Sequence, residues 1–412
     1  MIRQTENIVF SGDIIKGTTE IEKANTINQW TPLLAKAAAK LESMMVVSSE
    51  QVVRRDLDTE YKEKSDTVTI TVKVPTVASE HSDSGDDAVV YTEQKRDVKM
   101  DYHFQTTVSF TANELTQALS SGRFEVLDSM IDGMVDHLEE YMMDVFYKGS
   151  IGYAGEAGAT MSDYTDIIEI RTIANKQKMP GRNRTLIVNP DAAGALLGLD
   201  QWKNFSASGT TAGLIAADLG SRAGFDIKES SFVPTHTGAF EALNVTDTVT
   251  IVVASNSTMT DGTPYSSAVI TESGASSILT ITKDAIGYLT DDLGVKRYFT
   301  VLETTAAAIS GVVTAKITAM PTACTTTVLV FADKNKTSSV RNLAIQKDCV
   351  ALVARPLAPF PDIPSVTFNV GTGIPMRLSY QTAQGTSKTN MKLECLCKAI
   401  VLRGEGVTTR IG

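Results

Sequence analysis

Two segments of alternating apolar and polar residues stand out in the first third of the chain, at 67–74 and 97–110. A period of two is typical of a strand with one buried face. We expect the segments to pair as an antiparallel hairpin whose apolar face needs a partner, because a two-stranded ribbon is only marginally stable alone. The apolar members of the first segment are Val68, Ile70, Val72 and Val74.

The connection between these strands, residues 78–96, is acidic and holds His81, Asp83, Asp86, Asp87 and Glu93. We expect it to be solvated, as surface loops are. Contact between subunits is therefore the first hypothesis, with the carboxylates facing basic groups of a neighbour. The charged residues in and beside the hairpin that we predict to lie at such a contact are Asp83, Asp86, Asp87, Glu93, Lys95, Arg96, Arg54 and Arg55.

A helical pattern, with apolar residues at three- and four-residue spacing, covers about 124–147. At about 1.5 Å per residue this helix is roughly 35 Å long and can serve as a spine. A row of aspartates at i, i+4 spacing suggests either a cation site or a solvated face with basic groups opposite, and we prefer the face. The acidic residues expected to lie away from the apolar stripe are Asp128, Asp132, Asp136, Glu139, Glu140 and Asp144.

Beyond a glycine-rich break at 149–160, which suits a hinge, the pattern becomes that of a compact α/β region. It predicts a helix at about 166–178, a strand at 185–189, a helix that begins at Pro190 and a strand near 225–228. From about 238 to 337 helical periodicity nearly vanishes, and short apolar runs between turns indicate a small inserted all-β domain. More strands are expected between 366 and 402, and the residues from Arg403 read as a tail.

Composition favours a soluble globular protein, since 42% of the residues are apolar and 21% are charged. The net charge of −10 argues against a protein that reads nucleic acid by neutralising phosphates, although a local basic patch remains possible. The first residues do not form a signal peptide, and nowhere do about 18 apolar residues run together, so we expect no membrane contact.

Candidate chemistry is sparse. The four cysteines form no CxxC pair, and we expect Cys395 and Cys397 to pack as small apolar residues on a strand. The four histidines show no HxxxH spacing. We therefore predict no catalytic, cofactor-binding or metal site. The cysteines are Cys324, Cys349, Cys395 and Cys397, and the histidines are His81, His103, His137 and His236.

The order of these parts, together with several short stretches, resembles the major capsid (coat) proteins of tailed bacteriophages with the Hong Kong 97 fold. The likeness is to the coat proteins of short-tailed phages that carry an inserted β-barrel domain, and it covers essentially the whole chain. The stretches that carry it are 66–75, 98–115, 184–191, 223–228 with 233–237, and 342–348 with 354–357.

The resemblance implies an α+β fold with an N-terminal arm, an extended-loop hairpin, a spine helix, an axial α/β domain and an inserted all-β domain. The divisions it implies are an arm with a helix at 1–55, the extended loop at 56–112, the spine helix and start of the peripheral domain at 113–160, the axial domain at 161–237, the inserted β-domain at 238–338, a return to the axial domain at 339–365, and peripheral-domain strands with a C-terminal tail at 366–412.

The function implied is structural and not catalytic: self-assembly through pentamers and hexamers into an icosahedral shell that encloses the phage genome. The implied partners are other copies of the chain, a separate scaffolding protein during assembly, a portal protein at one vertex and packaged DNA by weak non-specific proximity, with no cofactor and no membrane. The implied location is the virion capsid, assembled in the host cytoplasm.

Two alternatives remain open. One is an encapsulin-like shell protein of a nanocompartment, which shares the fold and encloses enzyme cargo. The other, less favoured, is a β-rich enzyme or carbohydrate-binding protein, which predicts a monomer or small oligomer instead of a shell.

Overall fold

A computed structural model describes the chain at residues 45–57, 67–72, 94–111, 113–114, 125–155, 158–203, 217–237, 249–258, 264–272, 281–290, 296–305, 312–318, 327–328, 330–331, 338–358, 365–370, 374–382 and 388–411. The chain divides into two compact units, each described by itself below. The first unit includes His103–Met134 and Arg355–Leu396, and the second includes Met45–Tyr102, Val135–Ala354 and Cys397–Gly412. Residues 1–44 of the predicted arm and the tip of the hairpin lie outside the described residues.

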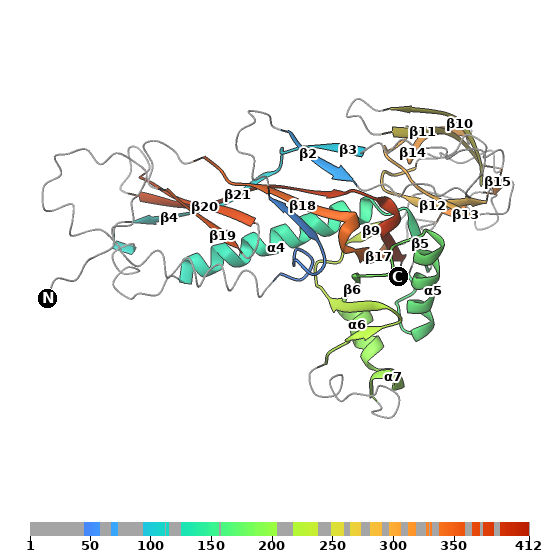
Figure 1. Cartoon of the computed structure of the whole chain (residues 1–412), viewed down its shortest axis with the longest axis horizontal. Coiled ribbons are helices and arrows are strands. Elements are labelled where there is room, and N and C mark those ends of the chain that lie inside the picture. The colour runs from blue at the N-terminus through green and yellow to red at the C-terminus, as the bar shows by residue number, and fades with distance from the viewer. Residues whose placement is uncertain are drawn as a thin grey trace, which may run out of the picture. The chain divides into compact units, whose positions relative to one another are not determined.

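The protein has a mixed α+β fold, as predicted (Figure 1). Its long helix, α4 (Glu125–Lys148), confirms the helix expected at 124–147. The apolar stripe is buried as its spacing requires, with Ile131, Leu138 and Met142 at 0% exposure. Three shorter helices follow, and they are α5 (Tyr164–Lys176), α6 (Pro190–Leu197) and α7 (Asp200–Lys203).

The sheet of the first unit is antiparallel throughout and has the order β4-β21-β20-β19. One face buries apolar side chains, among them Phe104, Leu378 and Leu393, and the other is polar. This alternation is the period of two that the sequence shows in 103–111. The strands are β4 (His103–Thr111), β21 (Lys388–Val401, in this unit as far as Leu396), β20 (Ile374–Thr382) and β19 (Ser365–Val370).

The predicted hairpin exists, but its second strand is shorter than expected. β2 (Thr67–Val72) pairs antiparallel with β3 (Gln94–Lys99), whereas the residues after Lys99 turn away through a bond from the amide of Asp101 to the carbonyl of Lys99. β4 then pairs with β21 instead of β2. The single strand expected at 97–110 was wrong because the apolar alternation continues through Met100 and Tyr102, so periodicity alone does not reveal the break.

A seven-stranded mixed sheet forms the centre of the second unit, in the order β5-β22-β17-β6-β8-β7, with β9 also pairing with β17. Helices α5 and α6 share one apolar core with this sheet, built around Ile170, Leu186, Leu196 and Phe225. The strands are β5 (Gly152–Ala154), β22 (Val407–Ile411), β17 (Ser338–Gln346), β6 (Arg184–Val188), β8 (Phe225–Glu229), β7 (Ser221–Arg222) and β9 (Thr235–Thr237).

The C-terminal residues are a core strand, and the expected tail is therefore wrong. β22 lies between β17 and β5, and all of its residues are buried. The sequence conceals the strand because three of its five residues are polar, and Arg410 is buried only because its guanidinium donates to Asp166 and to the carbonyl of Ile411. The glycine-rich break likewise contains β5, which is parallel to β22.

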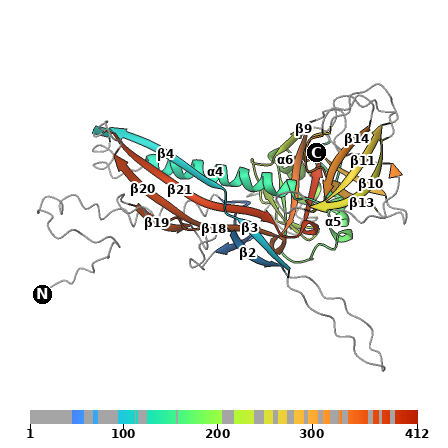
Figure 2. The same ribbon diagram turned by 90° about the horizontal axis from the view of Figure 1, so that it is seen from above.

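The strands between 249 and 331 form two sheets, and β10, β11, β13 and β14 of these sheets are labelled in Figure 2. Residues of both sheets share one apolar core, centred on Ile270, Leu289, Phe299 and Ile317. Within the described residues of this range there is no helix, as the loss of helical periodicity predicted. The strands are β10 (Val249–Thr258), β11 (Pro264–Glu272), β14 (Val312–Thr318) and β15 (Thr327–Val328) in one sheet, and β13 (Lys296–Thr300), β12 (Ile286–Thr290) and β16 (Val330–Phe331) in the other.

The amino-terminal part of the described chain joins the second unit through β1 (Arg54–Leu57), which runs parallel to β18 (Val350–Arg355). Two 3-10 turns complete the described elements, η1 (Lys347–Cys349) and η2 (Gly404–Gly406). The division of the chain into an arm, extended loop, axial, peripheral and inserted domains stays a prediction.

Candidate interaction site

The residues predicted to contact a neighbour fall into three groups. Lys95 and Arg96 lie on β3, where the side chain of Lys95 is exposed. Arg54 and Arg55 lie on β1, which belongs to a different sheet. The four acidic members of the set lie outside the described residues, and they are Asp83, Asp86, Asp87 and Glu93.

Part of the apolar face of the hairpin is already covered within the chain. Ile70 and Val98 are only 5% and 2% exposed, whereas Val68 on the same face is half-buried. At Ile70 and Val98 the expectation that this face needs a neighbour is therefore wrong. The opposite face is polar and open, and its exposed Lys95 and Lys99 can contact another subunit through charge and hydrogen bonds.

On β1, Arg55 has a structural role inside the chain. Its Nε and Nη2 atoms both donate to the carbonyl of Ser48, at 3.1 and 2.9 Å, and Nη2 also approaches the sulfur of Met45 at 3.6 Å. These contacts fold the segment that precedes β1 back on itself.

Glu139 departs from its predicted place, because it is buried at 1% exposure although it was expected on the solvated side of the helix. Its Oε2 accepts from the amide of Val47 at 2.7 Å and its Oε1 from the amide of Ser48 at 2.9 Å; the Ser48 hydroxyl also donates to Oε1. Burial raises the pKa of Glu139, and the bonds from Ser48, Val47 and Val46 oppose that rise. Buried carboxylates require such donors.

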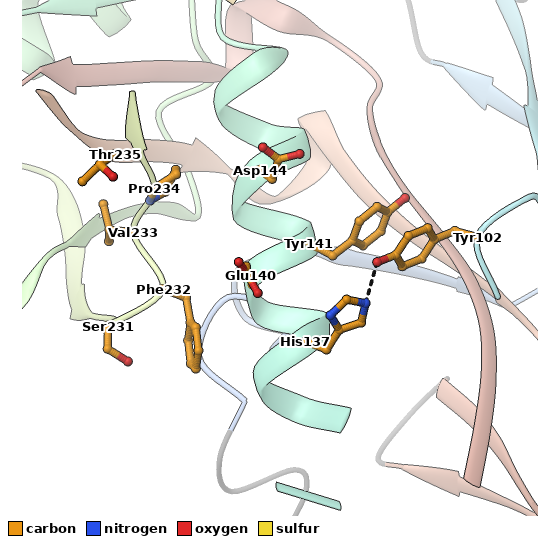
Figure 3. A pocket seen from close by; sticks show the side chains of 10 residues that line it. All are labelled: Tyr102, His137, Glu140, Tyr141, Asp144, Ser231, Phe232, Val233, Pro234 and Thr235. Atoms are coloured by element: carbon orange, nitrogen blue, oxygen red, sulfur yellow. Dashed lines mark hydrogen bonds between the residues drawn. The ribbon is translucent and has the colours of Figure 1, made fainter. Parts of the chain in front are cut away.

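A groove of about 710 Å³ runs along the second-unit part of α4 (Figure 3). The ring of Tyr102 stacks on Tyr141 at a centroid distance of 3.8 Å, and the Tyr102 hydroxyl lies 2.7 Å from Nε2 of His137. Burial raises the pKa of both tyrosines. The remaining lining residues are Glu140, Asp144, Ser231, Phe232, Val233, Pro234 and Thr235.

The charged groups of the groove lie on one helix. Glu140 and Asp144 are one turn apart on α4, and Asp144 is paired with Lys148 at 2.6 Å. Flat aromatic rings beside carboxylates suit a basic side chain better than an anion.

A buried ion pair lies on the polar face of the sheet of the first unit. Arg377 donates from Nε and Nη2 to one oxygen of Glu394, at 3.0 and 2.6 Å, and the two side chains are 4% and 1% exposed. Lys392 reaches the other oxygen at 2.5 Å, and His103 approaches it at 3.4 Å. Burial by itself raises the pKa of Glu394, but the bonds and charges of Lys392 and Arg377 hold it below its usual value. The cluster is a structural bridge between strands.

A second polar cluster joins β9 to the turn before β12. Nε2 of His236 lies 3.4 Å from the carbonyl of Lys283, and its ring meets that of Tyr147 edge-on at 6.4 Å. Burial, and next the charge of Arg341, lowers the pKa of His236, while burial lowers the pKa of Arg341 to about 10. Burial also raises the pKa of Asp284 in the same turn.

The cysteines behave as the pattern predicts. Cys395 and Cys397 are fully buried in β21, and burial raises the pKa of Cys349 to about 11, so that its thiol stays protonated. Among the described residues, no group of three or more histidine, cysteine and carboxylate side chains could hold a metal ion. No helix in the described part of the chain is long and apolar enough to cross a membrane.

No protein-family model and no curated protein matches the chain. It is similar to the mature capsid of bacteriophage PhiM1, with 10% identity, a TM-score of 0.45 and coverage of 89% of this chain and 87% of that one. The capsid structure of the cyanophage P-SCSP1u gives 10% identity, a TM-score of 0.43 and coverage of 89% and 87%. A virus-like particle from Pyrococcus furiosus gives 7% identity and a TM-score of 0.39, with coverage of 93% of this chain and 99% of that one. The chain is similar to capsid structures.

The sequence missed Glu139, and the only signal that could have revealed it is its position beside the apolar stripe, three residues before Met142 and one after Leu138. A carboxylate at the margin of a stripe can face either way, since the pattern does not show which other segment supplies donors.

Proposed function

We propose that the chain is the major capsid protein of a tailed phage, a structural subunit that assembles with its own copies into a closed shell around the genome. The observation that supports this best is the order of elements along one chain: hairpin β2–β3, the 24-residue helix α4, the α/β sheet with α5 and α6, the two small sheets β10–β16, and the return through β17 to β22. This order agrees with the one that the sequence resemblance implies for coat proteins with an inserted β-domain, and the proposal puts that domain at 238–338.

The polar face of the hairpin is the proposed contact with the next subunit. Lys95 and Lys99 are exposed on β3, and the acidic stretch 73–93 connects β3 to β2. Basic and acidic groups in one segment can pair with a neighbour, and such a contact repeated around five- and sixfold axes closes a ring. The same proposal includes assembly through pentamers and hexamers, a separate scaffolding protein, a portal protein and weak contact with packaged DNA.

Two variants of the hairpin tip test the contact. One deletes 79–93, and the other keeps the length but changes Asp83, Asp86, Asp87 and Glu93 to the matching amides. We expect both subunits to fold with wild-type circular dichroism, because the buried side chains of β2 and β3 are retained. The deletion should reduce shell yield strongly, and the neutralised tip should give an intermediate yield that depends on salt.

Size-exclusion chromatography and negative-stain micrographs provide the readout. Normal, equally stable shells from both variants would show that the hairpin tip is not a contact between subunits. A nanocompartment shell would instead give particles that hold protein cargo and no genome, and an enzyme or carbohydrate-binding protein would elute as a monomer or small oligomer. The contents of particles from infected cells therefore separate the first two functions.

A further inference from the structure

Two consecutive residues of the segment before β1 converge on one carboxylate. The amides of Val47 and Ser48 donate to Glu139 at 2.7 and 2.9 Å, and the Ser48 hydroxyl adds a third donor. Successive amides that point inward form a concave anion-binding nest. Here the anion belongs to helix α4 of the same chain, so the nest joins two segments that are about 90 residues apart in sequence.

The joint is closed to water. Val47 and Ser48 are 0% exposed and Glu139 is 1% exposed. Hydrogen bonds to a buried charge are stronger than neutral ones, and the donors left behind if the carboxylate is removed have no water to replace it. Breaking these hydrogen bonds therefore costs free energy that water does not return.

A second set of bonds locks the same segment. The Ser49 hydroxyl donates to the carbonyl of Val46 at 2.8 Å, and Arg55 bonds the carbonyl of Ser48 through two guanidinium nitrogens. The segment continues directly into β1, which pairs with β18. Contacts therefore run from Glu139 through Ser48 and Arg55 to β1, which pairs with β18.

We propose that Glu139 is a clasp that holds 46–48 on α4 and thereby keeps β1 beside β18. Opening the clasp releases both 46–48 and β1. The expected fall in shell yield when the clasp opens rests on the proposed capsid function, whereas the clasp itself is a property of the single subunit.

Hydrogen exchange on the unassembled full-length subunit tests the clasp. Glu139→Ala removes the carboxylate, and Ser48→Ala removes only the hydroxyl donor and guards against a Glu139 variant that fails to fold. Glu169→Gln on the exposed side of α5 is the matched control. We expect the amides of 46–48 and of β1 to exchange about tenfold faster or more in Glu139→Ala, less so in Ser48→Ala, and at the wild-type rate in the control, since about 1.4 kcal/mol is one factor of ten.

Unchanged exchange at 46–48 in a folded Glu139→Ala subunit would overturn the clasp. Shell yield is measured on the same three variants, and we expect it to fall with the loss of protection and to stay normal in the control. Faster exchange with normal shells would overturn the role of the clasp in assembly. If the wild-type chain forms no shells at all, the proposed function fails, and the exchange result still decides whether the clasp exists.

Discussion

Replacing Ile411 by alanine is expected to destabilise the second unit severely, although this residue is the next to last of the chain. Its side chain is 0% exposed and packs with Tyr153 and Ile286, with Tyr288 and Tyr298 against the same cluster. A residue in a frayed terminus would contribute almost nothing. The substitution therefore separates a core strand from a tail.

The magnitude follows from the burial. Ile→Ala removes roughly three methylene equivalents, and at about 0.8 kcal/mol each the lost transfer free energy is about 2.4 kcal/mol. The cavity left among aromatic rings that cannot collapse freely adds to this, so we expect a total of about 3–4 kcal/mol, within the usual range for such changes. The matched control is Ile168→Ala on α5, because Ile168 is 44% exposed and should lose less than about 1 kcal/mol.

Urea unfolding of the unassembled subunit measures the loss. Trp202 is 2% exposed and its Nε1 donates to the carbonyl of Leu219 at 2.9 Å, so its fluorescence reports the packed core of the second unit. The experiment uses a Trp30→Phe background, since the chain has only two tryptophans. A lower midpoint with an unchanged slope is expected for Ile411→Ala. Equal midpoints for the Ile411 and Ile168 variants would refute the assignment of β22 as a core strand.

Two further predictions concern the polar clusters. Glu394→Gln leaves Arg377 buried without its carboxylate and should lower the stability of the first unit by about 3–5 kcal/mol. The control is His103→Gln, whose side chain is 42% exposed and which should cost less than about 1 kcal/mol. Hydrogen-exchange protection of β20 and β21 measures both losses of stability, and equal losses would contradict this account. Because the folded state lowers the pKa of His236, the unfolded chain takes up the proton first, so stability should fall as pH drops below about 6.5, by up to about 1.4 kcal/mol per pH unit. His236→Gln should remove that part of the slope, and an unchanged slope between pH 7.5 and 5.5 would show that His236 does not titrate in this way.

Periodicity predicted the elements that pack through one apolar face. α4, α5 and β2 were expected within a few residues of their observed bounds, because each repeats its apolar positions often enough to define a period. β22 was missed because its buried residues are mostly polar, and the bonds that help to bury them come from partners far away in the sequence, Gln177 for Thr408 and Asp166 for Arg410.

The candidate site could be predicted only in part. Alternation revealed the hairpin and its charged connection, but it could not show that the chain itself covers Ile70 and Val98. The direction in which Glu139 faces depended on donors from residues 46–48, and local sequence carries no signal for such a partner. The break between β3 and β4 depended likewise on β21, which supplies the second pairing partner.

The most direct test of the central claim is electron microscopy of the purified full-length protein, alone and after co-expression with the other structural proteins of its source. The account predicts closed icosahedral shells built from rings of five and six subunits, and DNA-filled shells of the same size in an infection lysate. A uniform population of monomers or small oligomers under all of these conditions would contradict it.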